Sequence, residues 1–149
     1  MVGYLIDTNI LLRLEDEDDP RHEQCSCAIE RLRDCKEPLF VCAQTLAEFW
    51  VVMTRPRDVN GWGLKFEDAI EQMADVCGSF RCLSEPPDIG DRWYQTVLSN
   101  RAMGKPAYDA KLVALMTAHG IDRLITLNPD DFARYSEITA LTPVQIIGT

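Results

Sequence analysis

The sequence lacks the features of several large protein classes. Its 149 residues contain no apolar run long enough to span a membrane, and no charged, apolar and small-residue succession that would indicate a secretory signal. We therefore expect a soluble, cytoplasmic protein. A Gly-rich phosphate loop, a Gly-x-Ser-x-Gly elbow and a His-Glu-x-x-His helix are also missing, so the chemistry of those motifs is not expected.

Positive charge is scarce, because 15 Lys and Arg stand against 24 Asp and Glu, which gives a net charge of -9. This balance argues against a broad basic surface that binds nucleic acid through its phosphates. It does not exclude a nuclease, since clustered carboxylates bind divalent cations that bring their own positive charge to a phosphate. An acidic surface also suits a basic protein partner. We interpret the acidic run from Glu15 to Asp19 as a solvated loop.

The cysteine pattern does not indicate a metal site. Cys25-Ser-Cys27 is too short and isolated for zinc, and no second pair lies at ligand spacing. Without a secretory signal, we expect the thiols to be reduced and to pack as small apolar groups. The six cysteines are Cys25, Cys27, Cys35, Cys42, Cys77 and Cys82.

Short apolar runs alternate with segments whose apolar residues repeat at helical spacing, which is typical of an α/β fold with a mainly parallel sheet. About five short strands are expected, at residues 4–6, 39–42, 80–83, 123–127 and 138–141. Helices are expected at residues 10–14, 20–33, 44–54, 66–76, 88–100 and 106–119, followed by a tail from Thr142-Pro143. The helix at 66–76 should place Ala69, Ile70, Met73 and Val76 inward. We expect one domain, residues 1–149, of three α/β/α layers.

Three acids occupy positions where a buried carboxylate is costly unless an opposite charge compensates it. Asp7 directly follows the first expected strand, within the stretch Val2 to Asn9, and the carboxyl ends of strands are where open α/β sheets bind ligands. Glu48 interrupts an apolar helix, and Asp109 lies in the first turn of another. Mg²⁺ and Mn²⁺ prefer oxygen ligands, so a shared cleft of these acids would suit a divalent ion.

Each of these acids also has a simpler interpretation. Asp7 can be the cap of the helix that follows it. Glu48 can be an exposed helix residue, and Asp109 can complement the helix macrodipole. The two histidines, His22 and His119, are interpreted as structural or exposed.

Four motifs, in this order, resemble the PIN-domain ribonucleases and more closely the VapC-type toxins of bacterial toxin-antitoxin pairs. They are Leu-Ile-Asp-Thr-Asn at residues 5–9, Ala-Glu-Phe at 47–49, Ala-Tyr-Asp-Ala-Lys-Leu-Val-Ala at 107–114, and Leu-Ile-Thr-Leu-Asn-Pro-Asp-Asp-Phe at 124–132. The resemblance implies an endoribonuclease in which Asp7, Glu48 and Asp109 hold Mg²⁺ or Mn²⁺ for hydrolysis of an RNA phosphodiester. Thr8, Asn9 and Thr126 would orient these carboxylates.

The fourth motif departs from the family pattern. Asn128 stands where many members carry an acid, so it would be an amide ligand or a hydrogen-bond donor. Asp131 either approaches the metal through water or caps the end of the strand. With one charge fewer, a second ion would be held less tightly, so the number of metal ions stays open.

The resemblance also implies partners: an RNA substrate, a small antitoxin protein and a second copy of the chain in a homodimer. A helix of the antitoxin would lie in an apolar groove near Phe49, Trp50 and Trp62, unless these aromatics belong to the core. The candidate cations for guiding the RNA backbone are Arg13, Arg101, Lys105 and Lys111.

Two other functions stay open at this point. An aspartate-nucleophile phosphatase would need a second acid two residues after Asp7, where the chain has Asn9. A catalytically weak binding module would use the acids only to hold a basic protein partner.

Overall fold

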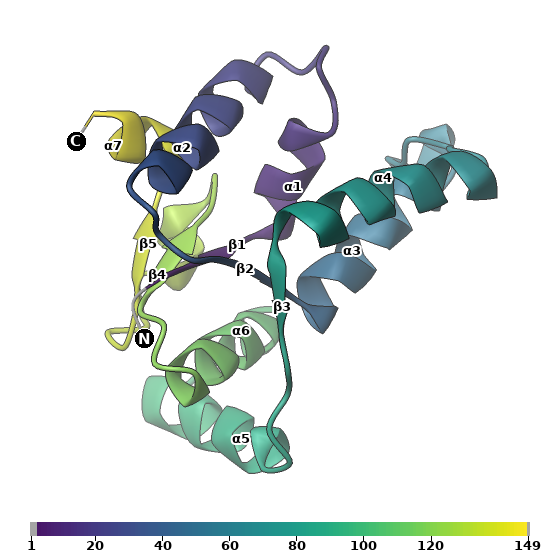
Figure 1. Cartoon of the computed structure of the whole chain (residues 1–149). Coiled ribbons are helices and arrows are strands. Elements are labelled where there is room, and N and C mark those ends of the chain that lie inside the picture. Colours follow the sequence, from purple (N-terminus) through teal and green to yellow (C-terminus); the bar gives the residue numbers. More distant parts are fainter. Residues whose placement is uncertain (1–2, 149) are drawn as a thin grey trace.

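The computed structural model describes residues 3–148 and forms an α/β fold (Figure 1). Met1, Val2 and Thr149 lie outside the described residues, so the first residue of the Val2 to Asn9 stretch is not placed. The strands are β1 (Tyr4–Ile6), β2 (Leu39–Cys42), β3 (Arg81–Leu83), β4 (Arg123–Ile125) and β5 (Thr139–Leu141). The helices are α1 (Thr8–Leu14), α2 (His22–Asp34), α3 (Ala43–Thr54), α4 (Phe66–Ser79), α5 (Ile89–Asn100), α6 (Pro106–Ala118) and α7 (Pro143–Ile147). Two short 3-10 helices are η1 (Arg57–Val59) and η2 (Pro129–Phe132).

The five strands form one sheet in the order β3-β2-β1-β4-β5, and every neighbouring pair is parallel. Tyr4 of β1 pairs with Leu39 of β2 on one side and with Arg123 of β4 on the other. Both faces of β1 and β2 are buried, which explains why these strands are continuous apolar runs rather than alternating ones. The predicted parallel α/β fold is confirmed.

Helices cover both faces of the sheet and enclose two hydrophobic cores (Figure 1). Successive residues of a strand point to opposite faces. Ile6 therefore belongs to the core that contains residues of α1, α2, α3, α4 and α7, whereas Leu5 belongs to the core that contains residues of α6 and η2. Helix α5 packs along the outer side of α6. The predicted three-layer α/β/α architecture is therefore confirmed.

The sheet topology determines where a site can form. Strand β1 lies between β2 and β4, where the strand order reverses. In open α/β sheets, ligands bind at such a reversal, outside the carboxyl ends of the strands. Helices α1 and α3 begin directly after β1 and β2, so their N-termini lie at that edge. Helix α6 leads into β4 and therefore also begins at that edge. Asp7, Glu48 and Asp109 belong to these three segments.

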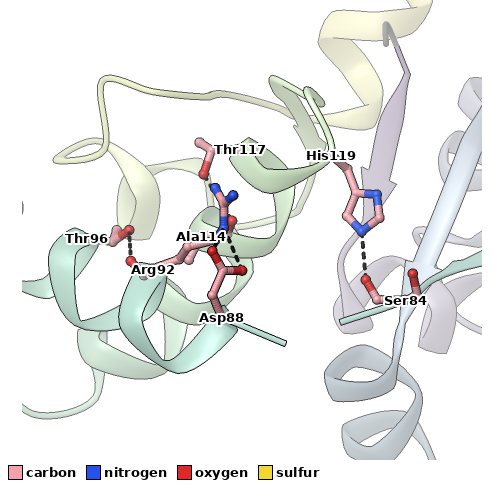
Figure 2. A network of polar contacts seen from close by, with 7 residues as sticks. All are labelled: Ser84, Asp88, Arg92, Thr96, Ala114, Thr117 and His119. Atoms are coloured by element: carbon pink, nitrogen blue, oxygen red, sulfur yellow. Dashed lines mark hydrogen bonds and ion pairs between the residues drawn. The ribbon is translucent and has the colours of Figure 1, made fainter. Parts of the chain in front are cut away.

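Polar contacts fix the α5 and α6 layer to the segment that follows β3 (Figure 2). His119 Nε2 lies 2.7 Å from the carbonyl oxygen of Ser84, and the Arg92 guanidinium pairs with the Asp88 carboxylate at 3.0 Å. On the other side of the sheet, His22 Nδ1 lies 2.8 Å from the carbonyl oxygen of Arg13. Both histidines thus have structural hydrogen bonds, as interpreted from the sequence.

Several element boundaries differ from the prediction. Strand β4 ends at Ile125 rather than at Leu127, because the polar groups that follow bond toward Asp7 and Asn9. The predicted C-terminal tail contains helix α7, which has a capping box between Thr142 and Gln145. The inward prediction for Ile70 is wrong, because 47% of this residue is exposed.

The acidic run from Glu15 to Asp19 is not simply a solvated loop. Glu15 is half-buried at the end of α1, and its carboxyl group shares a hydrogen bond with Asp75 of α4. Asp19 forms an ion pair with Arg13, at 3.4 Å. The interpretation is wrong for Glu15 and Asp19, whose partners lie on helices, whereas Glu17 and Asp18 are exposed as expected.

All six cysteines lie in the described part and are free thiols. Only Cys25 and Cys42 are buried, so the prediction that the thiols pack as apolar groups is wrong for the four exposed ones: Cys27, Cys35, Cys77 and Cys82. In the range 3–148, no helix has the length and apolar character needed to cross a membrane.

Candidate active site at the carboxyl edge of the sheet

The side chain of Asp7 is fixed at both of its oxygens. Oδ1 accepts a hydrogen bond from the backbone N–H of Thr8, at 2.8 Å, so Asp7 is the N-cap of α1. Oδ2 accepts a hydrogen bond from the Thr126 hydroxyl, also at 2.8 Å. An ionised carboxylate has about four acceptor sites, so each oxygen keeps capacity for one further partner.

Thr126 and Asn9 hold this arrangement in place. The hydroxyl oxygen of the buried Thr126 accepts hydrogen bonds from the side-chain amide of Asn9, at 3.2 Å, and from the backbone N–H of Asn128, at 3.1 Å. The Asn9 carbonyl oxygen accepts from the Leu127 N–H, at 3.1 Å. The Thr126 oxygen thus accepts two hydrogen bonds, and its own O–H group is the donor in the hydrogen bond to Asp7 Oδ2.

Glu48 is exposed on α3, yet both of its oxygens have partners. Oε2 accepts a hydrogen bond from the Thr8 hydroxyl at 2.9 Å, and Oε1 accepts one from the Gln44 amide at 3.3 Å. The same Gln44 nitrogen lies 3.3 Å from the carbonyl oxygen of Tyr108 and links α3 to the start of α6. Sequence reasoning missed Gln44, although its i,i+4 spacing to Glu48 was a weak signal.

Asp109 is partly exposed in the first turn of α6, and its carboxylate makes no hydrogen bond or ion pair with other residues of the described chain. Burial, together with the negative charges of Asp7, Asp131 and Glu48, raises the pKa of Asp109 to about 6, and Lys105 opposes this rise. The other three acids therefore repel the Asp109 carboxylate electrostatically.

Burial also raises the pKa of Asp7. Hydrogen bonds from Thr126 and Thr8 counteract the rise, whereas the charges of Glu48 and Asp131 increase it. The folded chain thus brings the three acids of the first three motifs within electrostatic reach of one another.

Asp131 and Asn128, the two candidate site residues of the fourth motif, differ in their surroundings. Asp131 lies in η2, its charge acts on both Asp7 and Asp109, and its side chain caps no strand or helix within residues 3–148. Asn128 is exposed, and its hydrogen bond to Thr126 comes from the backbone N–H rather than from the side-chain amide. The charge of Asp131 therefore acts on the acid cluster, whereas Asn128 contributes its backbone N–H to the Thr126 hydroxyl.

The donor set of this cluster fits a divalent cation. No ion pair within the described chain neutralises its acids, because Lys111 pairs with Glu85 at 3.1 Å and Arg13 pairs with Asp19. As the side chains stand, no group of three His, Cys, Asp or Glu residues between positions 3 and 148 is close enough to hold an ion. Carboxylates with raised pKa values and free lone pairs would nevertheless gain from a shared cation, which removes their repulsion.

Comparisons with known proteins match nearly the whole chain. Residues 4–138 match the family model of the PIN domain. Ribonuclease VapC24 of Mycobacterium tuberculosis is 27% identical over 151 residues, which covers 96% of this chain and 98% of the relative.

Solved structures share the fold. The structure of VapBC2 from Rickettsia felis, bound to a DNA fragment from its promoter, aligns with a TM-score of 0.73 at 14% identity and covers 95% of this chain and 98% of that one. A toxin-antitoxin complex from Klebsiella pneumoniae aligns with a TM-score of 0.65 at 22% identity, with coverage of 95% and 98%.

Proposed function

Because this chain belongs to the PIN-domain family, we propose that it is a divalent-metal-dependent endoribonuclease and the toxin of a type II toxin-antitoxin pair. The observation that carries the proposal is the electrostatic coupling of Asp7, Glu48 and Asp109 at the carboxyl edge of the sheet, without a cation that neutralises them in the described chain. The likeness to Ribonuclease VapC24 supports RNA as the substrate. We place this activity in the cytoplasm.

In this proposal the three acids hold Mg²⁺ or Mn²⁺ through carboxylate oxygens. When bound, the ion supplies positive charge that stabilises the phosphodiester during hydrolysis. The chain's own residues set the geometry: Thr126 and Thr8 fix the two oxygens of Asp7, and Gln44 and Thr8 fix those of Glu48. Outer hydrogen bonds of this kind orient metal ligands and increase their affinity.

RNA cleavage in the presence and absence of Mn²⁺ tests this function. Asp7→Asn and Asp109→Asn should each lower activity by more than about 100-fold, since even outer partners of metal ligands contribute about 10- to 100-fold. Asp130→Asn is the matched control, because Asp130 is an exposed acid of η2 whose charge acts on neither Asp7 nor Asp109. Equal activity in all four proteins, or activity that survives chelation, would contradict the proposal.

Calorimetric titration with Mn²⁺ separates the nuclease from a binding module whose acids only hold a basic partner. The nuclease should bind Mn²⁺ in a manner that Asp7→Asn abolishes. A chain that neither binds Mn²⁺ nor cleaves RNA, but captures a basic peptide through the same acids, would instead be the binding module.

We further propose that the antitoxin covers an apolar face of α3 and α4. Phe49 does not belong to this face, because it is fully buried and packs edge-on against Trp62, with ring centroids 6.3 Å apart. The exposed apolar residues are instead Val51 (50% exposed), Phe66 (62%) and Ile70 (47%). Their side chains suit an amphipathic helix laid along the face.

Co-expression with the small protein of a neighbouring gene tests this partner. Val51→Asp and Ile70→Asp should abolish co-purification and the relief of growth arrest, whereas the exposed Val144 on α7 provides the control Val144→Asp. Sedimentation of the free protein tests the proposed homodimer, for which a monomer at all concentrations is the contrary result.

A further inference from the structure

Tyr108 stands out among the exposed aromatic residues because it lies between two clefts next to the acid cluster. Tyr108 directly precedes Asp109 in the sequence, and 72% of its surface is exposed. One cleft, of about 570 Å³, is lined by Trp93, Gly104, Ala107, Tyr108 and Lys111, and we call it the indole cleft. The other, of about 460 Å³, includes Gln44, Glu48, Glu85, Tyr108 and Lys111, and we call it the acidic cleft.

The backbone that carries the Tyr108 ring is fixed relative to the acids. The Tyr108 carbonyl accepts a hydrogen bond from the Gln44 amide, which also donates to Glu48. The indole N–H of Trp93 donates to the Ala107 carbonyl, at 2.7 Å, and this contact fixes the wall of the indole cleft. The ring therefore projects from a rigid helix start.

The opposite wall is also held in place. Glu85 of the acidic cleft directly follows Ser84, whose carbonyl contacts the His119 ring at the end of α6 (Figure 2). Lys111 of α6 reaches across to the Glu85 carboxylate, at 3.1 Å. A cation is thus present between the two clefts, in a chain whose net charge is -9.

We propose that Tyr108 is a stacking platform for a base of single-stranded RNA beside the scissile phosphate, and that Lys111 contacts the backbone phosphate of that nucleotide. This inference rests on the proposed nuclease function. Exposed aromatic rings stack on bases of any sequence, and a nearby cation tracks the backbone. Glu85 competes with the phosphate for Lys111 and so limits RNA affinity.

The position of Tyr108 favours RNA over a second copy of the chain as its occupant. Glu48 lines the same cleft as Tyr108, so this cleft offers a strand whose phosphate lies at the acids a direct path to the ring. Single-stranded segments, unlike duplexes, leave their bases free to stack on aromatic side chains.

Binding of a fluorescein-labelled single-stranded RNA of mixed sequence tests the platform by anisotropy, with Mg²⁺ and in an Asp7→Asn background that prevents cleavage. Tyr108→Ala should weaken binding about 5- to 150-fold, as expected for one stacked base, and Tyr108→Phe should bind as tightly as Tyr108. Tyr94→Ala is the control, because Tyr94 is a half-exposed tyrosine of α5 that lines neither cleft.

A chain of abasic ribose phosphates separates base stacking from backbone contacts. Tyr108→Ala should leave its binding unchanged, whereas Lys111→Ala should weaken it and Glu85→Gln should strengthen it. Unchanged binding of the mixed RNA by Tyr108→Ala, or an equal loss on the abasic chain, overturns the proposal. So does dissociation of a dimer by Tyr108→Ala in sedimentation, since the ring would then belong to an interface between copies.

Kinetics in the otherwise wild-type protein distinguishes this inference from the nuclease function itself. Tyr108→Ala should raise KM and leave kcat unchanged, because stacking acts equally in the ground state and the transition state. If the wild type cleaves RNA and Tyr108→Ala has an unaltered KM, the platform is refuted and the nuclease stands. If the wild type cleaves no RNA but the anisotropy difference between Tyr108→Ala and Tyr108→Phe persists, the nuclease function is refuted and RNA stacking stands.

Discussion

The paired carboxyl groups of Glu15 and Asp75 should make the stability of the protein decrease as pH rises. Burial, and then the hydrogen bond and charge of Asp75, raise the pKa of Glu15 from 4.5 to about 8. The two residues are far apart in the sequence, but both line a small cavity between α1, α2 and α4. At neutral pH, the folded protein therefore holds a proton that the unfolded chain has released.

The sign and size follow from this difference in proton binding. Below about pH 4.5 Glu15 is protonated in both states, and its hydrogen bond contributes fully to stability. Between 4.5 and about 8 only the folded state keeps the proton, so stability falls with pH, and above 8 the contribution is lost. The difference of about 3.5 pKa units has an upper bound of about 5 kcal/mol. Because Glu15 is only half-buried, solvent screening reduces the expected loss to about 2 kcal/mol.

Urea unfolding of the wild type and Glu15→Gln between pH 5 and pH 9 measures this effect. The neutral amide keeps a hydrogen-bond donor toward Asp75 and does not titrate, so the variant should be about 2 kcal/mol more stable than the wild type at pH 9 and nearly equal to it at pH 5. Glu30→Gln is the control, because Glu30 is an exposed acid beside the same cavity. A stability difference between Glu15→Gln and wild type that stays constant with pH would refute the reasoning.

Three further predictions concern the site and its support. Thr126→Val should destabilise the protein by about 1–3 kcal/mol in urea unfolding and lower its Mn²⁺ affinity, because the buried hydroxyl donates to Asp7. Thr126→Ser keeps the hydroxyl and should restore both the stability and the affinity. Gln44→Ala should lower RNA cleavage about 10- to 100-fold, by freeing Glu48, with little change in stability; an unaltered rate would contradict its positioning role. Phe49→Ala should cost about 3–5 kcal/mol in unfolding free energy, and a loss below 1 kcal/mol would contradict its place in the core.

The sequence predicted the sheet well because a buried parallel strand leaves a direct pattern. The residues of β1 and β2 are apolar on both faces, so their short runs are recognisable without knowledge of any partner. The position of Asp7 followed from the same logic, since the chain must become polar where the strand leaves the core. Helix α7 was missed although Thr142 and Gln145 form a capping box, because five residues are too few to show helical periodicity.

Contacts between distant segments were beyond the reach of sequence patterns. Glu15 and Asp75 are ordinary helix-end and helix residues until the fold brings the end of α1 beside α4. The role of Gln44 was equally hidden, because Gln and Glu four residues apart are common on exposed helices. Only the hydrogen bond of Gln44 to the Tyr108 carbonyl makes this pair a link between α3 and α6. The association of Asp131 with the other acids likewise depends on where η2 lies.

Asp7 shows that capping a helix and holding a metal are compatible roles of one carboxylate. The cap fixes Oδ1 against the Thr8 N–H, and Thr126 fixes Oδ2, so the hydrogen bonds that cap α1 also set the orientation that a metal ligand needs. Asp7→Asn and Asp7→Ala separate the two roles, because Asn is as good an N-cap as Asp, whereas Ala is poor.

Both variants should therefore lose Mn²⁺ binding in calorimetry, since neither carries the charge of Asp7. In urea unfolding, Asp7→Asn should be about 1 kcal/mol more stable than Asp7→Ala, which is the ordinary cost of replacing a cap by Ala. Relief of the repulsion from Glu48 and Asp131, and loss of the carboxylate acceptor for the Thr126 hydroxyl, are common to both variants and cancel in this difference. Equal stability of Asn and Ala at position 7 would show that the hydrogen bond to Thr8 contributes nothing to folding, and that the carboxylate serves the acid cluster alone.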